Sequence, residues 1–139
     1  MLDYKLTLYK ISLKVTMATL KLTEQNFMET IDKNDMDIVD YWGQWCPSCR
    51  NFAPVFESVS EKYPEIVFAK LNTEEEQGLA SHFQIRSIPT LMIFREQIII
   101  FNQAGSLPAH HLEEVIQKAQ ALDMDLVREE IAKQPREQA

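Results

Sequence analysis

Residues Val39–Arg50, with the sequence VDYWGQWCPSCR, contain the only two cysteines of a 139-residue chain. Cys46 and Cys49 follow an apolar run and begin a segment with helical periodicity. Their sulfurs can meet when the first cysteine lies at a helix N-terminus and the second lies one turn inside the helix. The helix dipole and unpaired N–H groups stabilise a thiolate there, and Pro47 suits the first helical position. This stretch predicts a dithiol–disulfide site in which Cys46 attacks a substrate disulfide and Cys49 resolves the mixed disulfide.

Two other uses of the cysteine pair are less favoured. A zinc site needs two more ligands, and the only histidines are His82, His110 and His111. His110 and His111 are adjacent on an expected helix and therefore point in different directions. A purely structural disulfide would stabilise little, because the loop that it closes is short. We therefore expect redox chemistry at the cysteines, with no metal and no bound cofactor.

Asp40 places a carboxylate in an otherwise apolar strand, six residues before Cys46. A buried charge is costly unless its pKa rises or a partner neutralises it. Lys70, in the apolar segment Phe68–Leu71, is the candidate partner. The nearby cysteines favour Asp40 as a proton donor and acceptor for Cys49, and the alternative is a strand-end Asp that faces solvent.

Two further features predict a substrate-docking surface. Trp42 and Trp45 flank the cysteine motif and suggest an apolar rim for peptide-like substrates, although aromatic residues are often simply part of a core. A cis peptide bond between Ile88 and Pro89 would leave the backbone of Ile88 exposed to a substrate strand. A trans bond there would have no such role.

Composition and charge limit the class of protein. Hydrophobic residues at 45% and charged residues at 25% are typical of one globular domain of this length. The net charge of −7 argues against nucleic acid and anionic membranes as partners. No apolar run approaches the roughly 20 residues of a membrane span. Lys5, Lys10 and Lys14 interrupt any signal-peptide core, so we expect a cytoplasmic protein.

Hydrophobic periodicity predicts an α/β fold with a central mixed sheet flanked by helices on both faces. Residues 1–16 are expected to be an N-terminal extension, either an edge strand or poorly ordered. Residues 17–122 are expected to form the domain, and residues 123–139 a C-terminal helical extension with a frayed tail. Helices are expected over 24–33 (with Thr23 as N-cap), 47–62, 74–82 and from 108 onward, and strands over 37–42, 66–71, 89–94 and 98–101. Pro54 should bend its helix without ending it.

Several short motifs occur together in this sequence: Val39–Trp42, Trp45–Cys46, Cys49–Arg50, Pro54, Ala69–Asn72, Ile88–Thr90 and Gly105. On these motifs, the sequence resembles the thioredoxin family over about residues 17–122. The segments RNFAP (50–54) and IRSIPT (85–90) are most similar to the bacterial branch whose long form carries an N-terminal zinc ribbon. No cysteine precedes Cys46, so that ribbon is absent from this sequence.

The resemblance implies the thioredoxin fold and a monomeric thiol–disulfide oxidoreductase that takes part in electron transport and cell redox homeostasis. Its electrons would come from NADPH through thioredoxin reductase, and its clients would be proteins that contain disulfides. An oxidase or isomerase with a raised redox potential, and a protein-binding module with incidental redox activity, are the alternatives. The implied catalytic residues are Cys46, Cys49, Asp40 (the buried acid) and Lys70. The implied substrate-binding residues are Trp42, Trp45, Pro47, Ile88, Pro89 (in the cis form, against the disulfide) and Gly105.

The sequence departs from the family pattern at two places. The usual Cys-Gly-Pro-Cys motif is Cys46-Pro47-Ser48-Cys49 here. Because the hydroxyl of Ser48 could stabilise the Cys46 thiolate, we expect a weaker reductant than an ordinary thioredoxin. Glu96 and Gln97 replace the usual Asn-Gly, and both resist the positive φ of a tight two-residue turn, so a different turn is expected.

Overall fold

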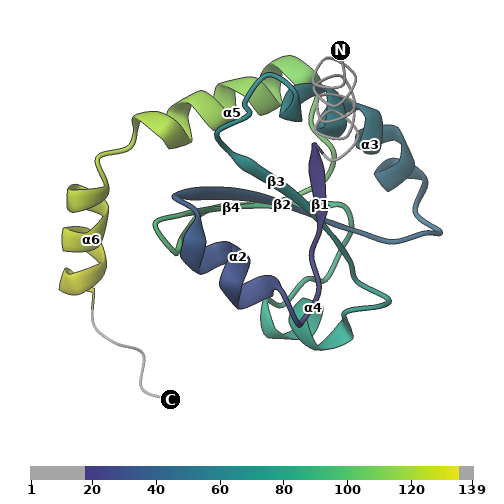
Figure 1. Ribbon diagram of the computed structural model, residues 1–139, viewed down its shortest axis with the longest axis horizontal. Helices are drawn as coiled ribbons and strands as arrows, with labels where there is room; N and C mark the ends of the chain where they lie inside the picture. The colour runs from purple at the N-terminus through teal and green to yellow at the C-terminus, as the bar shows by residue number, and fades with distance from the viewer. Residues whose placement is uncertain (1–17, 135–139) are drawn as a thin grey trace, which may run out of the picture.

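The computed structural model describes residues 18–134 (Figure 1), so the predicted N-terminal extension lies outside the described residues. A five-stranded sheet has the strand order β1-β3-β2-β4-β5. The first three of these strands are parallel, and β4 and β5 join them in antiparallel pairs. The predicted mixed sheet is thus confirmed. The elements are β1 (Thr19–Lys21), α2 (Phe27–Lys33), β2 (Met36–Trp42), α3 (Pro47–Ser60), β3 (Val67–Asn72), α4 (Gln77–His82), β4 (Thr90–Arg95), β5 (Ile98–Ala104), α5 (Ala109–Ala121) and α6 (Met124–Lys133).

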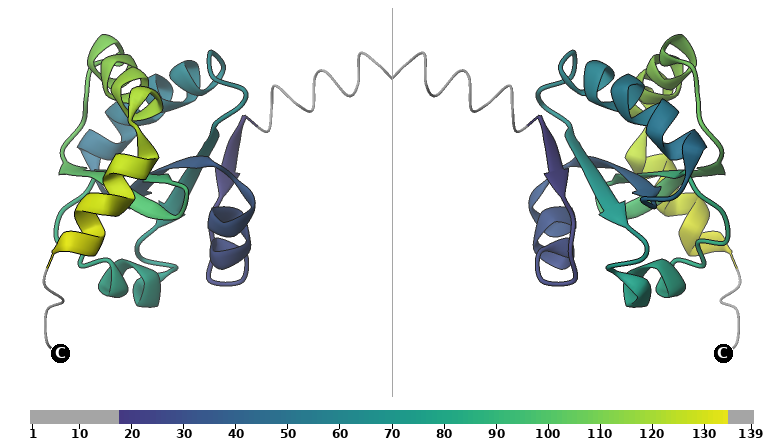
Figure 2. Two further views of the ribbon diagram at one scale, coloured as in Figure 1. Left: turned by 90° about the vertical axis from the view of Figure 1, so that its left-hand side faces the viewer. Right: turned by 90° about the vertical axis from the view of Figure 1, so that its right-hand side faces the viewer.

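Alternation along the central strand β2 divides the core into two layers. Ile38 points to the face covered by α3 and α5, and Val39 points to the face covered by α2 and α4 (Figures 1 and 2). Helices therefore cover both faces of the sheet, as predicted. The α3 and α5 layer includes Phe52, Phe56, Phe68, Leu112 and Ile116, and the other layer includes Leu22, Phe27, Ile31, Tyr41 and Met92.

Several element boundaries differ from the predicted ones. The short strand β1 was not predicted, because three residues are too few to show a period. Helix α2 begins at Phe27 and not at residue 24, since the N–H groups of Asn26 and Phe27 both bond to the carbonyl of Thr23 in a preceding turn. Thr23 is therefore not the N-cap. Helix α3 continues through Pro54, which confirms that this proline does not end it.

Helix α4 also begins later than predicted. The side-chain oxygen of Asn72 accepts hydrogen bonds from the N–H groups of Glu74 (2.9 Å) and Glu75 (3.3 Å). These bonds stabilise a turn before the helix. The glutamates therefore precede α4, which begins at Gln77 and not at residue 74.

The turn between β4 and β5 contradicts the sequence prediction. Glu96 (φ 51°) and Gln97 (φ 70°) both adopt positive φ in a two-residue connection. Such a turn matches the twist of a hairpin, which favours it despite the unsuitable side chains. Tertiary contacts also fix it: the N–H of Glu96 donates to the carbonyl of Asp35 at 2.7 Å, and the Glu96 carboxylate pairs with Arg128.

We predict that Gln97→Gly stabilises the protein by about 1 kcal/mol, because glycine adopts positive φ without the steric penalty of a side chain. The free energy of unfolding in urea measures the effect. Gln103→Gly is the matched control, since Gln103 is an exposed β5 residue without positive φ. The control should destabilise the protein, because glycine weakens a strand. Equal effects of both changes would contradict the prediction.

The C-terminal region forms two helices. A continuous helix was expected beyond residue 122, but a second helix begins there instead. The side chain of Asp123 caps α6 by accepting from the N–H groups of Asp125 and Leu126. Arg95 donates from Nη1 to the carbonyls of Ala119 (2.8 Å) and Leu122 (2.7 Å) and so fixes the end of α5.

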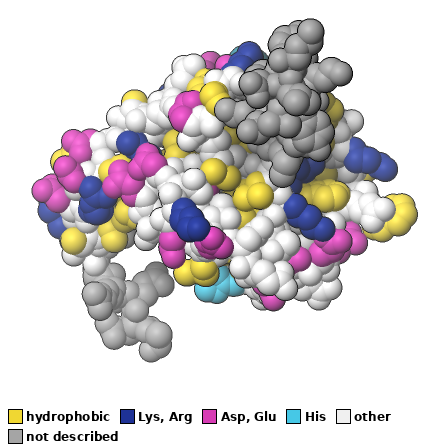
Figure 3. Space-filling model, in the orientation of Figure 1, with side chains coloured by type: hydrophobic (Ala, Val, Ile, Leu, Met, Phe, Trp, Pro, Cys, Tyr) yellow, Lys and Arg dark blue, Asp and Glu magenta, His cyan; other side chains and the backbone are white. Residues whose placement is uncertain are grey.

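Helix α6 lies beside the beginning of β5, and an apolar groove of about 360 Å³ separates them. Charged side chains of both signs lie on the outer surface of α6 (Figure 3). None of the helices described between residues 18 and 134 is both long and apolar enough to cross a bilayer.

Candidate active site

The cysteine motif lies where β2 leads into α3. Cys46 is the N-cap of α3 and Pro47 follows at the first helical position, which confirms the predicted placement. Cys46 and Cys49 form a disulfide with Cα atoms 5.2 Å apart. Chain connectivity alone brings the sulfurs together, because one helical turn separates the two residues.

The two sulfurs differ in environment. Sγ of Cys46 accepts a hydrogen bond from the N–H of Cys49 at 3.1 Å, as a capping atom does. The Cys46 side chain is partly exposed, whereas Cys49 is only 3% exposed. After reduction, the same N–H would stabilise a thiolate on Cys46. Cys46 is thus the sulfur that an external disulfide can reach.

A second loop lies against Cys46. The Ile88–Pro89 peptide bond is cis, as the resemblance implied, and the carbonyl oxygen of Ile88 lies 3.6 Å from Sγ of Cys46. The N–H of Gly105 donates to the carbonyl of Pro89 at 2.8 Å, so the structure brings Gly105 to the same loop. Close packing also explains Gly43, because a Cβ there would lie 2.7 Å from Cδ1 of Ile88.

Asp40 is fully buried, so the alternative of a solvent-facing strand end is wrong. It points to the same face of β2 as Ile38, the face that α3 covers. Neither carboxylate oxygen has a hydrogen-bond partner among the described residues. Burial raises its pKa to about 7, although Lys70 acts in the opposite direction. Lys70 is the register neighbour of Asp40 on β3, but its Nζ lies over the ring of Trp42, 5.1 Å from the centroid.

The predicted docking residues differ in exposure. Trp45 is 78% exposed and Pro47 is exposed beside it, whereas Trp42 is partly buried under Lys70. Trp45 therefore presents an apolar surface next to Cys46, and Trp42 has a packing role as well.

Asp37 is a second buried carboxyl that the sequence analysis missed. It is 1% exposed, and its carboxylate oxygens lack a hydrogen-bond partner among the described residues. Burial, together with the charge of Asp35, raises its pKa to about 7. Because they are three positions apart along the strand, Asp37 and Asp40 point to opposite faces of β2. A second acidic residue within the apolar strand was the signal that could have identified it.

Metal ligation has no support in residues 18–134, where no three His, Cys, Asp or Glu side chains come together as a possible ligand set. The groups present at the site are the two sulfurs, with Asp40 buried on the face of the sheet that α3 covers. A mixed sheet with a C-x-x-C pair at a helix start, opposite a cis-proline loop, defines a thiol–disulfide oxidoreductase.

Comparisons with known proteins agree with this class. Residues 18–118 match the thioredoxin family model. The chain is 46% identical over 117 residues to "Putative thioredoxin 2" of Streptomyces coelicolor, covering 84% of this chain and 87% of the relative. It is 35% identical over 99 residues to the thioredoxin of Buchnera aphidicola, covering 70% and 92%. The chain belongs to the thioredoxin family, and it is a protein-disulfide reductase.

Solved structures show the same fold. A thioredoxin mutant from Halobacterium salinarum matches with a TM-score of 0.69 and 26% identity, covering 76% of this chain and 93% of that one. A Plasmodium falciparum thioredoxin matches with a TM-score of 0.67 and 27% identity, covering 72% and 98%. Helix α6 lies beyond the residues that the family model matches.

Proposed function

We propose that this protein is a cytoplasmic reductase that takes electrons from NADPH through a thioredoxin reductase and passes them to disulfide-containing client proteins. The unequal exposure of the two sulfurs supports Cys46 as the attacking thiol and Cys49 as the resolving thiol, and the similarity to thioredoxins supports the electron route. The Cys46 thiolate attacks a client disulfide, and one client sulfur leaves as a thiolate. The Cys49 thiolate then attacks Sγ of Cys46, which releases the second client thiol and forms the Cys46–Cys49 disulfide. The client gains two electrons, and the protein loses two.

Asp40 is proposed to accept the proton that Cys49 loses before it attacks. The buried thiol has no ready access to bulk water, and a carboxyl with a pKa near 7 can exchange a proton at neutral pH. Lys70 would favour the ionised carboxylate from the neighbouring strand. The cysteine exchange is thus coupled to a proton acceptor within the sheet.

The client chain is proposed to lie across Ile88, Pro89 and Gly105, with Trp45 and Pro47 as an apolar border and Trp42 supporting them from below. The carbonyl of Ile88 lies close to Cys46, so a client strand that bonds to this backbone would hold its disulfide near the attacking sulfur.

NADPH oxidation in the presence of a bacterial thioredoxin reductase and a disulfide-containing protein tests the electron route. We expect NADPH consumption that depends on this protein and is stoichiometric with the client thiols formed. A protein that chemical dithiols reduce but the reductase does not would contradict the proposal. The equilibrium potential in glutathione buffers then separates a reductase from an oxidase or isomerase, whose potential would lie well above the cytoplasmic glutathione value. We expect the potential to fall in the Pro47→Gly/Ser48→Pro variant, which restores the usual motif.

A further inference from the structure

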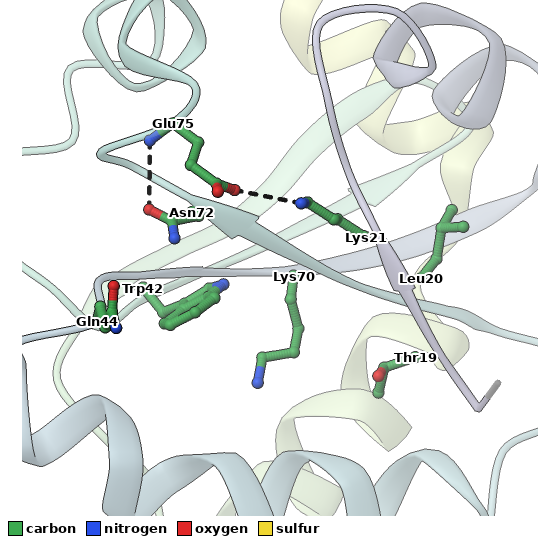
Figure 4. Close-up of a pocket in the computed structure, with 8 residues that line it drawn as sticks. All are labelled: Thr19, Leu20, Lys21, Trp42, Gln44, Lys70, Asn72 and Glu75. Atoms are coloured by element: carbon green, nitrogen blue, oxygen red, sulfur yellow. Dashed lines mark hydrogen bonds and ion pairs between the residues drawn. The ribbon is translucent and has the colours of Figure 1, made fainter. Parts of the chain in front are cut away.

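A cleft of about 380 Å³ opens beside the active site, between the edge strand β1 and the residues that follow β2 (Figure 4). It lies at the carboxyl ends of the parallel strands β1 and β3, where open α/β sheets commonly bind ligands. Of its lining residues, the proposed function uses only Lys70, as the neighbour of Asp40, and Trp42, as a support for the client border. The cleft is lined by Thr19, Leu20, Lys21, Trp42, Gln44, Lys70, Asn72 and Glu75.

Two lysines supply positive charge to the cleft. Lys21 and Lys70 are register partners on adjacent parallel strands, so both point to the same face of the sheet. Lys70 extends into the cleft (Figure 4), is held over Trp42, and forms no ion pair within 4.0 Å among the described residues. An amine that an aromatic ring holds in a concave site is preorganised to bind an anion. This positively charged site lies in a protein whose net charge is −7.

Glu75 shows which chemistry the cleft accepts. Its carboxylate pairs with Nζ of Lys21 at 3.3 Å, and the two side chains are 53% and 69% exposed, respectively. Exposed ion pairs of this kind are weak, so an incoming carboxylate can take the place of Glu75. Glu75 is therefore an internal competitor for a site that binds carboxylates.

Neutral donors complete the lining. The side-chain oxygen of Asn72 is already used by the N–H groups of Glu74 and Glu75, which leaves its amide nitrogen as a donor. Gln44 is exposed at the edge of the cleft, two residues before Cys46 in the chain. A client whose disulfide has reached Cys46 would have its neighbouring residues close to this edge.

We propose that the cleft binds an aspartate or glutamate side chain of the client, close to the disulfide under attack, and so selects acidic client segments. This inference rests on the proposed disulfide reductase function. It concerns the side of the motif that faces β1, opposite the Ile88–Pro89 loop.

Peptide disulfides test the inference. Matched peptides carry Glu or Gln at each of several positions flanking the reactive cysteine, and kcat/KM is measured for their reduction by the pre-reduced protein. We expect Glu to be preferred about two- to fivefold at one or two positions at low salt, with the preference falling as salt rises. Lys21→Gln should remove the preference, and Glu75→Gln should increase it by releasing Lys21. Both residues are exposed, so folding should not be affected.

Lys62→Gln is the matched control, because Lys62 is an exposed lysine that pairs with Glu113, away from the cleft. It should leave the preference unchanged. Equal rates for Glu and Gln peptides at every position, or a preference that survives Lys21→Gln, would overturn the inference while leaving the reductase function intact. Failure to reduce any of the peptides would instead count against the proposed function.

Discussion

Cys46→Ser is expected to lower client reduction by roughly 10³-fold or more, because no other thiol at the site can reach an external disulfide. Cys49→Ser should also stop turnover, but only after the first exchange. The client then remains covalently attached to Cys46, because nothing resolves the mixed disulfide. The two variants thus separate attack from resolution.

Mass spectrometry of the intact protein, mixed with a peptide disulfide, measures both outcomes. Cys49→Ser should accumulate a one-to-one adduct that dithiothreitol removes, and Cys46→Ser should remain unmodified. Ser48→Ala is the control for a hydroxyl change at the motif and should retain turnover. The opposite pattern of adducts would reverse the assignment of the attacking sulfur.

Asp40→Ala is expected to stabilise the protein by about 3 kcal/mol at about pH 8. The carboxyl ionises at its ordinary pKa of 3.8 when the chain is unfolded, and at about 7 when it is buried. Because the pKa is higher in the folded state, ionisation of Asp40 destabilises the folded protein. This destabilisation is absent below about pH 4, grows between about pH 4 and 7, and is constant above that range. Each pKa unit corresponds to about 1.4 kcal/mol, and cavity formation offsets part of the gain.

Urea unfolding of wild type and variant at a series of pH values tests this. The gain in the free energy of unfolding of Asp40→Ala over wild type should be smallest near pH 4 and greatest above pH 7. A difference that does not change with pH would contradict a raised pKa for Asp40.

Asp37→Ala is the matched variant for the catalytic role of Asp40. Its pKa is raised in the same way, so the same pH-dependent stabilisation is expected. Asp37 faces the α2 and α4 layer, away from Cys49, so client reduction should be unchanged. Asp40→Ala should slow client reduction, because Cys49 then lacks its proposed proton acceptor. Equal rates of client reduction in the two variants would show that Asp40 affects the stability of the protein and not its catalysis.

The sequence identified the parts of the structure that depend on local patterns. Apolar runs predicted β2 and β4, helical spacing predicted α3, and the cysteine spacing predicted a helix start at Cys46. The short strand β1 was missed because its formation depends on pairing with β3, which no local pattern reveals.

Tertiary contacts explain the remaining differences. The carbonyl of Asp35 and the side chain of Arg128 fix Glu96 in a turn that its own propensity disfavours. Asp37 stands near the start of the strand, where acidic side chains are often exposed, so only its place in an apolar run marks it as buried. The cleft proposed to bind client carboxylates contains Lys21 and Lys70. These two lysines are distant in sequence and become neighbours only through the register of β1 and β3.

Strand β5 is the last strand of the sheet, and it begins with the apolar run Ile98–Phe101. Apolar, β-prone edge strands recruit identical strands from other molecules and so initiate aggregation. Helix α6 lies beside the beginning of this run, with the apolar groove between them and its charges outward. Helix α6 therefore covers part of the apolar beginning of this edge strand, and we expect a chain that lacked α6 to expose Ile98 and Ile99 further and to self-associate more readily.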